Sequence, residues 1–367
     1  MANLPFMTLA PGDDAAAVAE AVERVIASGW FVLGPEVEAF EREFAEASGA
    51  RFAVGVGTGT DALALTLRAL EIGPGDEVIT SPLSAAFSAL AILMAGATPV
   101  FADIDPDRLT LDPAAVDAAV TMRTAAIMPV HLYGQAADMT AIEAIARRHD
   151  LVVVEDACQA HLATCAGRSV GTWGAAGAFS FYPTKNLGAL GDGGAVVTND
   201  PMIADRLRRL RNGGQSHRYE HVEFGVNSRL DEIQAAVLRA RLPRLAGWTR
   251  ARRALAARYR AALDGTPAQA PPECDSGHVY HLFPVLVQAR DAFQRALEAA
   301  GIGTLVHYPL PLPRQQAFAH LPAASCPVAD RVAASVCSLP LHPGLTPGDV
   351  ERVATAARAW SPPARGA

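Results

Sequence analysis

The chain has 367 residues, of which half are apolar and 19% are charged, and its formal net charge is -7. This length allows one large domain and a smaller one, each with its own core, in a globular protein. The acidic balance argues against a nucleic-acid partner. The most apolar window, residues 89–102, is interrupted by Gly96 and Pro99 well short of a membrane span, so we expect a cytoplasmic protein with no membrane partner.

The first two thirds of the chain alternate short apolar runs with helical periods. After an amphipathic helix near residues 14–28, we predict strands at 52–56, 77–81, 98–104, 125–133 and 151–157, with helices between them at 61–70, 86–96, 113–120 and 141–149. Apolar runs separated by helices of this length are typical of a parallel sheet with crossover connections. Further strands at 177–183 and 193–200 follow each other more directly.

The last third of the chain predicts a second, smaller α/β unit. A helical region from residue 228 to about 263 is interrupted at Pro243 and is expected to bridge the two domains. Strands are then predicted at 280–288 and 303–308, and helices at 291–302, 328–337 and 347–360. We place the large domain at residues 1–245, with an N-terminal helix that can pack on the small domain, and the small domain at 246–367.

Lys185 is the single lysine in a chain with thirty arginines. A guanidinium stays protonated in proteins, whereas a lysine amine can lose its proton in a suitable site and attack a carbonyl. A position that needs an amine therefore explains Lys185. The alternative, a solvated surface residue, has to be decided by the neighbouring residues.

Three segments near predicted strand ends carry groups that fit one cofactor. GVGTGTDAL, residues 55–63, places glycines and Thr60 before a helix whose first N–H groups can seat a phosphate, although such turns are also common without a ligand. LVVVEDACQAH, residues 151–161, ends a strand in two carboxylates that point to opposite faces. Asp156, followed by Gln159, can hold a ring nitrogen protonated in the crevice where α/β ligands bind; the alternative is a helix cap.

The third segment is FSFYPTKNLGALGDGGAVVTND, residues 179–200, in which Ser180 lies five residues before Lys185. A hydroxyl for a phosphate, an amine for an aldehyde and an acid for a ring nitrogen together describe pyridoxal 5'-phosphate (PLP). The five cysteines contain no CxxC pair, so we expect neither a disulfide framework nor a metal site.

The chain resembles the DegT-type (DegT/DnrJ/StrS) PLP-dependent aminotransferases of nucleotide-linked keto sugars, in the aspartate-aminotransferase fold group. The resemblance runs almost end to end and includes SGWFVLGPEVEAFE, GTGTDALALTLRALEIGPGDEVI, PVHLYGQAADM, EDACQAH, AFSFYPTKNLGALGDGGAVVTND, NSRLDEIQAAVLRARL and GIGTLVHYP. It implies fold type I, an α/β fold whose large domain has a mixed, mostly parallel sheet and whose C-terminal domain is smaller.

The resemblance also implies site roles. Lys185 is the Schiff-base lysine, Asp156 pairs with the pyridine nitrogen and Gln159 lies beside the ring. The phosphate pocket matches Gly59, Thr60, Asp61 and Ser180, and Asn227 matches a residue that reaches the phosphate of the partner subunit, so we expect a homodimer with shared active sites.

Other residues are candidates for substrate binding. Family members carry a ring-stacking aromatic where this chain has Ala85; Phe87 can serve instead or can be a core aromatic. His307 and Tyr308 match a segment near the active site, or are plain strand-edge residues. His131 and Tyr133 end a predicted strand and can be ligand-facing or core residues. Arg229 can bind a substrate anion or pair with Asp231 or Glu232.

The function implied by the resemblance is transfer of an amino group, from an amino acid such as L-glutamate, to the keto carbon of a nucleotide-linked deoxysugar. The PVHLYGQ segment is more similar to enzymes that act at carbon 3 than at carbon 4. The retained Lys185 favours transamination over the related dehydratases, which carry histidine there. The alternatives are a cyclitol (keto-inositol) aminotransferase and a non-catalytic regulator that binds a sugar nucleotide.

Overall fold

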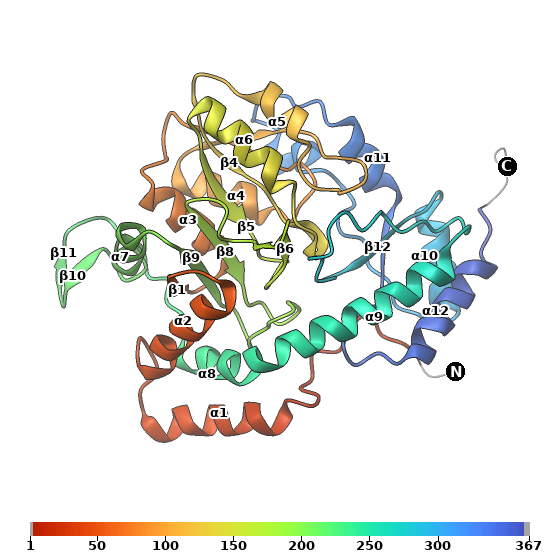
Figure 1. Cartoon of the computed structure of the whole chain (residues 1–367), viewed down its shortest axis with the longest axis horizontal. Helices are drawn as coiled ribbons and strands as arrows, with labels where there is room; N and C mark the ends of the chain where they lie inside the picture. The colour runs from red at the N-terminus through yellow and green to blue at the C-terminus, as the bar shows by residue number, and fades with distance from the viewer. Residues whose placement is uncertain (1–2, 363–367) are drawn as a thin grey trace.

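The computed structural model describes residues 3–362, and its centre is a seven-stranded sheet (Figure 1). In spatial order the strands are β1 (Phe52–Val56), β9 (Gly194–Thr198), β8 (Ala176–Ser180), β5 (Val152–Asp156), β4 (Thr124–Met128), β2 (Glu77–Thr80) and β3 (Thr98–Phe101). From β8 to β3 all neighbours are parallel, whereas β9 is antiparallel to both β8 and β1. The mixed, mostly parallel sheet agrees with the prediction.

Helices cover both faces of the sheet because successive strand residues enter different cores. On β5, for example, Val154 packs with α3 (Gly59–Ala69), α4 (Phe87–Ala95) and α7 (Pro201–Leu210), whereas Val153 packs with the opposite layer. That layer contains α2 (Pro35–Ser48), α5 (Pro113–Ala119), α6 (Met139–His149) and α8 (Glu232–Arg241). The strands are buried on both sides, which explains their continuous apolar sequences.

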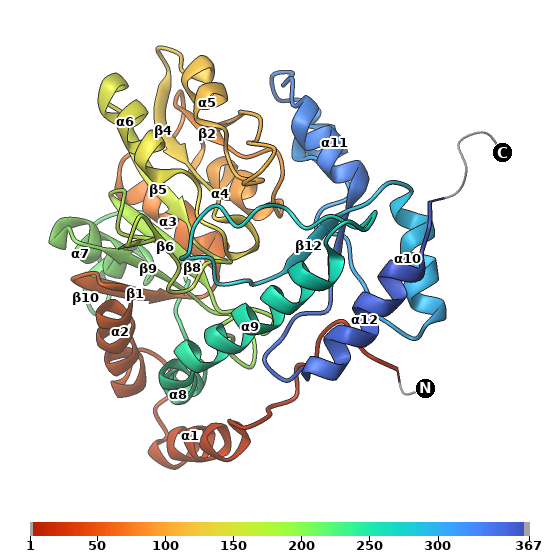
Figure 2. The ribbon, with the colours of Figure 1, turned by 45° about the vertical axis from the view of Figure 1, so that its right-hand side comes forward.

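The helical bridge is broken where the sequence predicts it. The short 3-10 helix η2 (Leu242–Arg244) contains Pro243 and leads into α9 (Leu245–Leu263), which runs from the sheet to the C-terminal part of the chain (Figures 1 and 2). There β12 (Phe283–Leu286) pairs antiparallel with β13 (Val336–Leu339). A separate core unites these strands with α9, α10 (Arg290–Ala299) and α12 (Pro347–Ala359).

The N-terminal segment contacts both parts of the molecule. Leu4 exchanges backbone hydrogen bonds with Gly301 and Gly303, at 2.8 and 2.9 Å, and joins the C-terminal core. The first helix, α1 (Ala15–Ser28), packs instead on α8. It is therefore the extended stretch before α1, and not the helix, that lies on the C-terminal part. The boundary at residue 245 stays a prediction.

Two C-terminal predictions were wrong. Residues 303–308 form no strand beyond a single bridge between Leu305 and Ser338. The helix predicted at 328–337 is α11 (Pro327–Ser335), and the residues after it form β13, because Val336 and Cys337 pair with β12. Periodicity cannot reveal such a non-local pairing.

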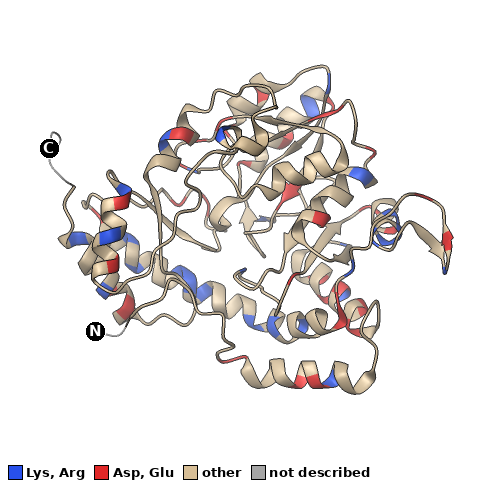
Figure 3. Ribbon diagram, turned by 180° about the vertical axis from the view of Figure 1, so that it is seen from behind, with Lys and Arg blue, Asp and Glu red and all other residues tan. Residues whose placement is uncertain are grey.

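Smaller elements complete the described chain. They are the hairpin β6–β7 (Thr164–Cys165 and Arg168–Ser169), the projecting hairpin β10–β11 (Gln215–His217 and Glu220–His221), η1 (Leu132–Gly134), η3 (Leu312–Arg314) and η4 (Gln316–Phe318). Seen from behind, acidic and basic residues are interspersed, with several arginines along α9 (Figure 3). Over residues 3–362, no helix has the length and apolarity needed to span a membrane, and no group of His, Cys, Asp and Glu is arranged to hold a metal.

Candidate active site

The predicted cofactor residues meet at the carboxyl ends of β5 and β8. Asp156 is the last residue of β5, Ser180 is the last of β8, and Gly59 opens α3. A Cβ on Gly59 would lie 2.7 Å from Ser180 Cβ and 2.8 Å from Cys158 Sγ, closer than real side chains approach. Glycine at position 59 therefore lets the start of α3 come close to the ends of both strands.

The first turn of α3 offers backbone donors. Thr58 caps the helix, since its Oγ1 accepts from the Asp61 N–H at 3.0 Å and its carbonyl accepts from the Ala62 N–H. The N–H groups of Gly59 and Thr60 have no acceptor among the described residues, as expected at a helix start. The start of α3 therefore presents two free N–H groups and the positive end of the helix dipole beside Ser180.

The Asp61 side chain has a different environment from the one the phosphate-pocket prediction suggests. Its Oδ2 accepts a hydrogen bond from Ser228 Oγ at 2.7 Å, and Ser228 Oγ accepts from the Gly57 N–H at 2.9 Å. A carboxylate repels a phosphate, so this side chain is better suited to anchoring the segment 227–229 beside α3 than to contacting the anion.

The Asp156 carboxylate is buried, with 6% of the residue exposed, and is held at both oxygens. Ser88 Oγ donates to Oδ2 at 2.6 Å, and the Cys158 N–H donates to Oδ1 at 3.1 Å. These two hydrogen bonds fix the orientation of the carboxylate. No helix starts at Asp156 in the structure, so the helix-cap alternative was wrong.

Glu155 points to the opposite face and is part of the scaffold. It accepts hydrogen bonds of 2.7–3.0 Å from the N–H groups of Gly171, Trp173 and Gly174 and lies 3.0 Å from His131 Nε2. His131 Nδ1 accepts from the Ala137 N–H, so Nε2 carries the proton and donates it to Glu155. Of the alternatives for His131, the core residue is correct.

Lys185 lies in the turn after β8, where its N–H donates to the Tyr182 carbonyl at 2.9 Å. The residue is partly buried, and its amine has no hydrogen bond or ion pair with any residue from 3 to 362. Burial lowers the pKa of Lys185, against the opposing charges of Cys158 and Asp156. A partly buried amine beside Asp156, with its pKa lowered, contradicts the solvated-surface alternative.

Three imidazoles lie close enough to Lys185 to feel its charge and are held neutral. Burial, reinforced by the charge of Lys185, lowers the pKa of His161 to about 3 and of His307 to about 4, and brings that of His281 well below its ordinary value. His161 Nε2 donates to the Ser180 carbonyl at 2.9 Å, which helps to orient the end of β8, while its buried Nδ1 has no hydrogen-bond partner in the described part of the chain.

Gln159 connects the sheet to the C-terminal part of the chain. Its Oε1 accepts from the Tyr133 N–H at 2.8 Å and its Nε2 donates to Tyr308 Oη at 3.1 Å. Tyr133 Oη in turn donates to the His307 carbonyl, and His307 Nδ1 lies 2.9 Å from Ser338 Oγ. Burial raises the pKa of Tyr308 to about 12. His307 and Tyr308 therefore contact this site and are not plain edge residues.

Three further candidates are exposed or bonded to residues outside this cluster. Asn227 is exposed, and Arg229 donates to Asn212 Oδ1 at 3.1 Å and makes no ion pair with Asp231 or Glu232. Glu232 instead accepts from the first N–H groups of α2. Phe87 starts α4 and is 59% exposed, so the core-aromatic alternative was wrong.

The sequence did not reveal several residues that contact the site residues, and Ser88 is the clearest of them. It is the only polar residue in α4, FSALAILMA, which is the signal that could have marked it. Cys158 and His161 lie within a quoted motif but were assigned no role.

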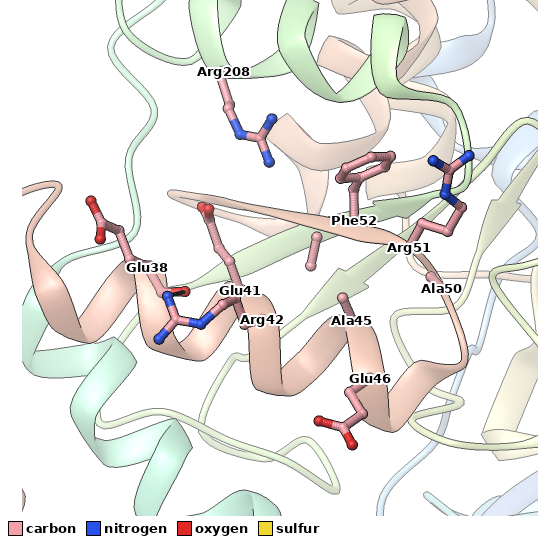
Figure 4. Close-up of a pocket in the computed structure, with 10 residues that line it drawn as sticks. Glu38, Glu41, Arg42, Ala45, Glu46, Ala50, Arg51, Phe52 and Arg208 are labelled. Atoms are coloured by element: carbon pink, nitrogen blue, oxygen red, sulfur yellow. Dashed lines mark hydrogen bonds between the residues drawn. The ribbon is translucent and has the colours of Figure 1, made fainter.

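A large surface hollow elsewhere in the molecule is not this site. The hollow, of about 610 Å³, lies between α2 and β1 (Figure 4). Arg51 and Arg208 approach the ring of Phe52, at 5.3 and 6.0 Å from its centroid, and acidic side chains of α2 line the other side. None of the predicted site residues lines it.

Comparison with known proteins identifies the family. The model of the DegT/DnrJ/EryC1/StrS aminotransferase family matches residues 13–358. A curated relative from Streptomyces venezuelae, "dTDP-3-amino-3,4,6-trideoxy-alpha-D-glucose transaminase", is 50% identical over 345 residues, which is 93% of this chain and 91% of the relative.

Solved structures agree in fold. S. venezuelae DesV in complex with a ketimine intermediate is 48% identical, with a TM-score of 0.95, and covers 98% of this chain and 99% of its own. NtdA from Bacillus subtilis with bound cofactor PMP is 30% identical, with a TM-score of 0.91 over 97% of this chain and 85% of its own. The likeness confirms the predicted fold class, that of fold type I aminotransferases, and the chain is an aminotransferase of the DegT/DnrJ/EryC1/StrS family.

Proposed function

We propose that this aminotransferase uses PLP to move an amino group from an amino acid, with L-glutamate as the expected donor, to the 3-oxo carbon of a dTDP-linked deoxyhexose. The observation that carries the proposal is the meeting of three groups in one place: the free N–H groups of Gly59 and Thr60, the buried Asp156 carboxylate and the Lys185 amine. An anion seat, a carboxylate opposite the ring nitrogen and an amine for the aldehyde are what PLP requires.

The residues present fit PLP. The first N–H groups of α3 and the Ser180 hydroxyl would bind the phosphate, and glycine at position 59 would admit the close approach that this needs. The Asp156 carboxylate, oriented by the hydrogen bonds from Ser88 and the Cys158 N–H, would face the ring nitrogen and favour its protonated form. When bound, PLP supplies a ring that withdraws electrons from the reacting carbon.

We assign acid–base catalysis to the Lys185 amine. Burial lowers the pKa of its amine, so a larger fraction is neutral near pH 7 than for an exposed lysine. A neutral amine is the form that would bond to the PLP aldehyde, and it is also the form that can take a proton from a substrate carbon and return it. An arginine at position 185 could do neither.

The sugar substrate is inferred from two observations. The relative from S. venezuelae is named a dTDP-3-amino sugar transaminase, and half of its aligned residues are shared with this chain. In addition, Gln159, Tyr133, His307 and Tyr308 form a polar wall from both parts of the chain beside the cofactor residues. Such a wall can bind hydroxyl groups of a hexose near its keto carbon.

The proposed working unit is a homodimer with shared sites. Asn227 is exposed, and the segment between the hairpin β10–β11 and Asn227 presents Val222 and Phe224, which are 56% and 94% exposed. Trp30 and Phe31, before α2, are also about half exposed, at 56% and 48%. Exposed aromatic residues in this number are typical of a surface that another subunit covers, and this arrangement would allow Asn227 to reach the phosphate in the partner.

The test is an assay with three acceptors. The purified protein with PLP and L-glutamate is incubated with a dTDP-3-oxo-deoxyhexose, its 4-oxo isomer or a keto-inositol, and the amino product is detected by mass. We expect product from the 3-oxo sugar alone, and none from Lys185→Arg. Product from keto-inositol alone would establish the cyclitol alternative. No amination of any acceptor, together with binding of the sugar nucleotide, would favour a regulator.

A further inference from the structure

Asn186, the residue after the proposed catalytic lysine, is held in place by hydrogen bonds of its side chain. Asn186 is buried, with 5% of the residue exposed. Its Nδ2 donates to the Val279 carbonyl at 3.0 Å, and its Oδ1 lies 3.3 Å from His281 Nδ1. A buried amide with both ends bonded has one orientation, so the backbone next to Lys185 is fixed against residues 279–281.

These contacts define the tautomer of His281. The Asn186 amide nitrogen is committed to the Val279 carbonyl, so the atom that faces His281 is an acceptor. His281 Nδ1 must therefore carry a proton. Because burial and the charge of Lys185 keep this imidazole neutral, Nε2 has no proton.

The segment that carries His281 is itself held rigidly. The Val279 N–H donates to the carbonyl of Gly134, the residue after Tyr133, at 2.9 Å. The buried guanidinium of Arg252 donates to the carbonyls of Tyr280, His281 and Leu341 at 2.8–3.3 Å. The Asn186 side chain is thus bonded to a segment, residues 279–281, that is itself held in position.

We propose that His281 and Asn186 are positioning residues for Lys185: the imidazole, protonated at Nδ1, orients the Asn186 amide, and the amide fixes the backbone from which the lysine side chain extends. The inference rests on the proposed role of Lys185. It goes beyond that role by assigning the placement of the amine to a pair from two distant parts of the chain.

The proposal predicts how the pKa of the Lys185 amine changes when the hydrogen bond between His281 and Asn186 is removed. The charged and titratable groups around Lys185 are Asp156 and Cys158 from the end of β5, His161 from the turn after it, and His281 and His307 from the C-terminal part. A loosened lysine keeps these neighbours but gains water. Because burial is the main cause of its low pKa, added water raises that pKa toward the ordinary value.

The single lysine makes the measurement direct. The protein without cofactor is labelled with acetic anhydride at a series of pH values, and the peptide that contains Lys185 is quantified by mass. In His281→Phe, which fills the space but removes the donor, we expect the midpoint of labelling to rise by about half a pH unit or more and kcat to fall about five- to tenfold, with KM within about twofold. In His281→Asn, an amide nitrogen can replace Nδ1, and we expect near wild-type values.

The matched control is His278→Phe. His278 is also buried in this segment, but its Nδ1 accepts from the Tyr280 N–H and it does not contact the lysine turn. A labelling midpoint and kcat in His281→Phe equal to those of His278→Phe would overturn the proposal, as would an His281→Asn variant that behaves like His281→Phe. If His281→Phe does not fold, Asn186→Leu, which removes both hydrogen bonds, decides by the same readouts.

The labelling requires neither cofactor nor sugar. Failure of the wild-type protein to aminate any keto sugar would count against the proposed function and would leave the midpoints unchanged.

Discussion

Replacement of Ser88 by alanine tests the site most quantitatively. Ser88 Oγ donates one of the two hydrogen bonds that hold the Asp156 carboxylate, at 2.6 Å in a buried position. Hydrogen bonds to a charged group contribute about 1.5–3 kcal/mol. If that stabilisation of the ionised carboxylate is expressed in the transition state, kcat falls by about tenfold to about a hundredfold.

The assay measures kcat and PLP retention together. The phosphate seat is untouched in Ser88→Ala, so we expect the protein to bind PLP with nearly wild-type affinity while kcat falls. The matched control is Ser84→Ala, because Ser84 Oγ lies 3.3 Å from Ser88 Oγ, is equally buried and makes no contact with Asp156. If Ser88→Ala and Ser84→Ala have the same kcat, the role assigned to the Ser88 hydrogen bond is refuted.

Three further predictions concern stability, pH and assembly. Asp14→Asn breaks the buried 2.7 Å pair with Arg241, so we expect a loss of about 3 kcal/mol in the free energy of unfolding. Burial raises the pKa of Asp14, but the hydrogen bond and charge of Arg241 outweigh it and lower the pKa below its unfolded value. The stability difference should therefore be full above pH 3.8 and should shrink as the pH falls through the folded pKa. His161 has a folded pKa of about 3, so the unfolded chain takes up its proton from pH 6.5 downward while the native state does not; the wild type should therefore lose stability over this range more steeply than His161→Phe, and equal slopes in urea titrations would contradict the burial argument. Lys185→Ala and Asn227→Ala subunits, each inactive alone, should restore activity when mixed, whereas no rescue after proven subunit exchange would place Asn227 outside the partner's site.

The large-domain sheet could be predicted because its strands are buried on both faces. Runs such as VVV before Asp156 stand out from the helical periods around them, and the structure confirms β5 there. In contrast, α2, PEVEAFEREFAEAS, was not predicted, and its apolar residues are spaced among six acidic or basic ones. Its position is fixed by a tertiary contact, since Glu232 accepts from the first N–H groups of the helix.

The candidate site was predictable to the extent that it lies at strand ends. Asp156 and Ser180 end neighbouring parallel strands, so their proximity follows from the order of the sheet. The partners that tune them come from other parts of the chain: Ser88 is 68 residues from Asp156, and His281 is 95 residues from Asn186. No local pattern encodes such pairings, and only the folded structure brings them together.

The central claim, that Lys185 holds the cofactor, can be tested directly because an untagged chain has one site for a lysine-specific protease. Borohydride reduction of the PLP-loaded protein should fix the cofactor to the Lys185 amine as a secondary amine that the protease cannot accept. We predict that the unreduced protein, denatured and stripped of cofactor, gives two fragments split after residue 185, whereas the reduced protein stays whole and carries one added cofactor mass. A reduced protein that is still cut after residue 185 would contradict the account.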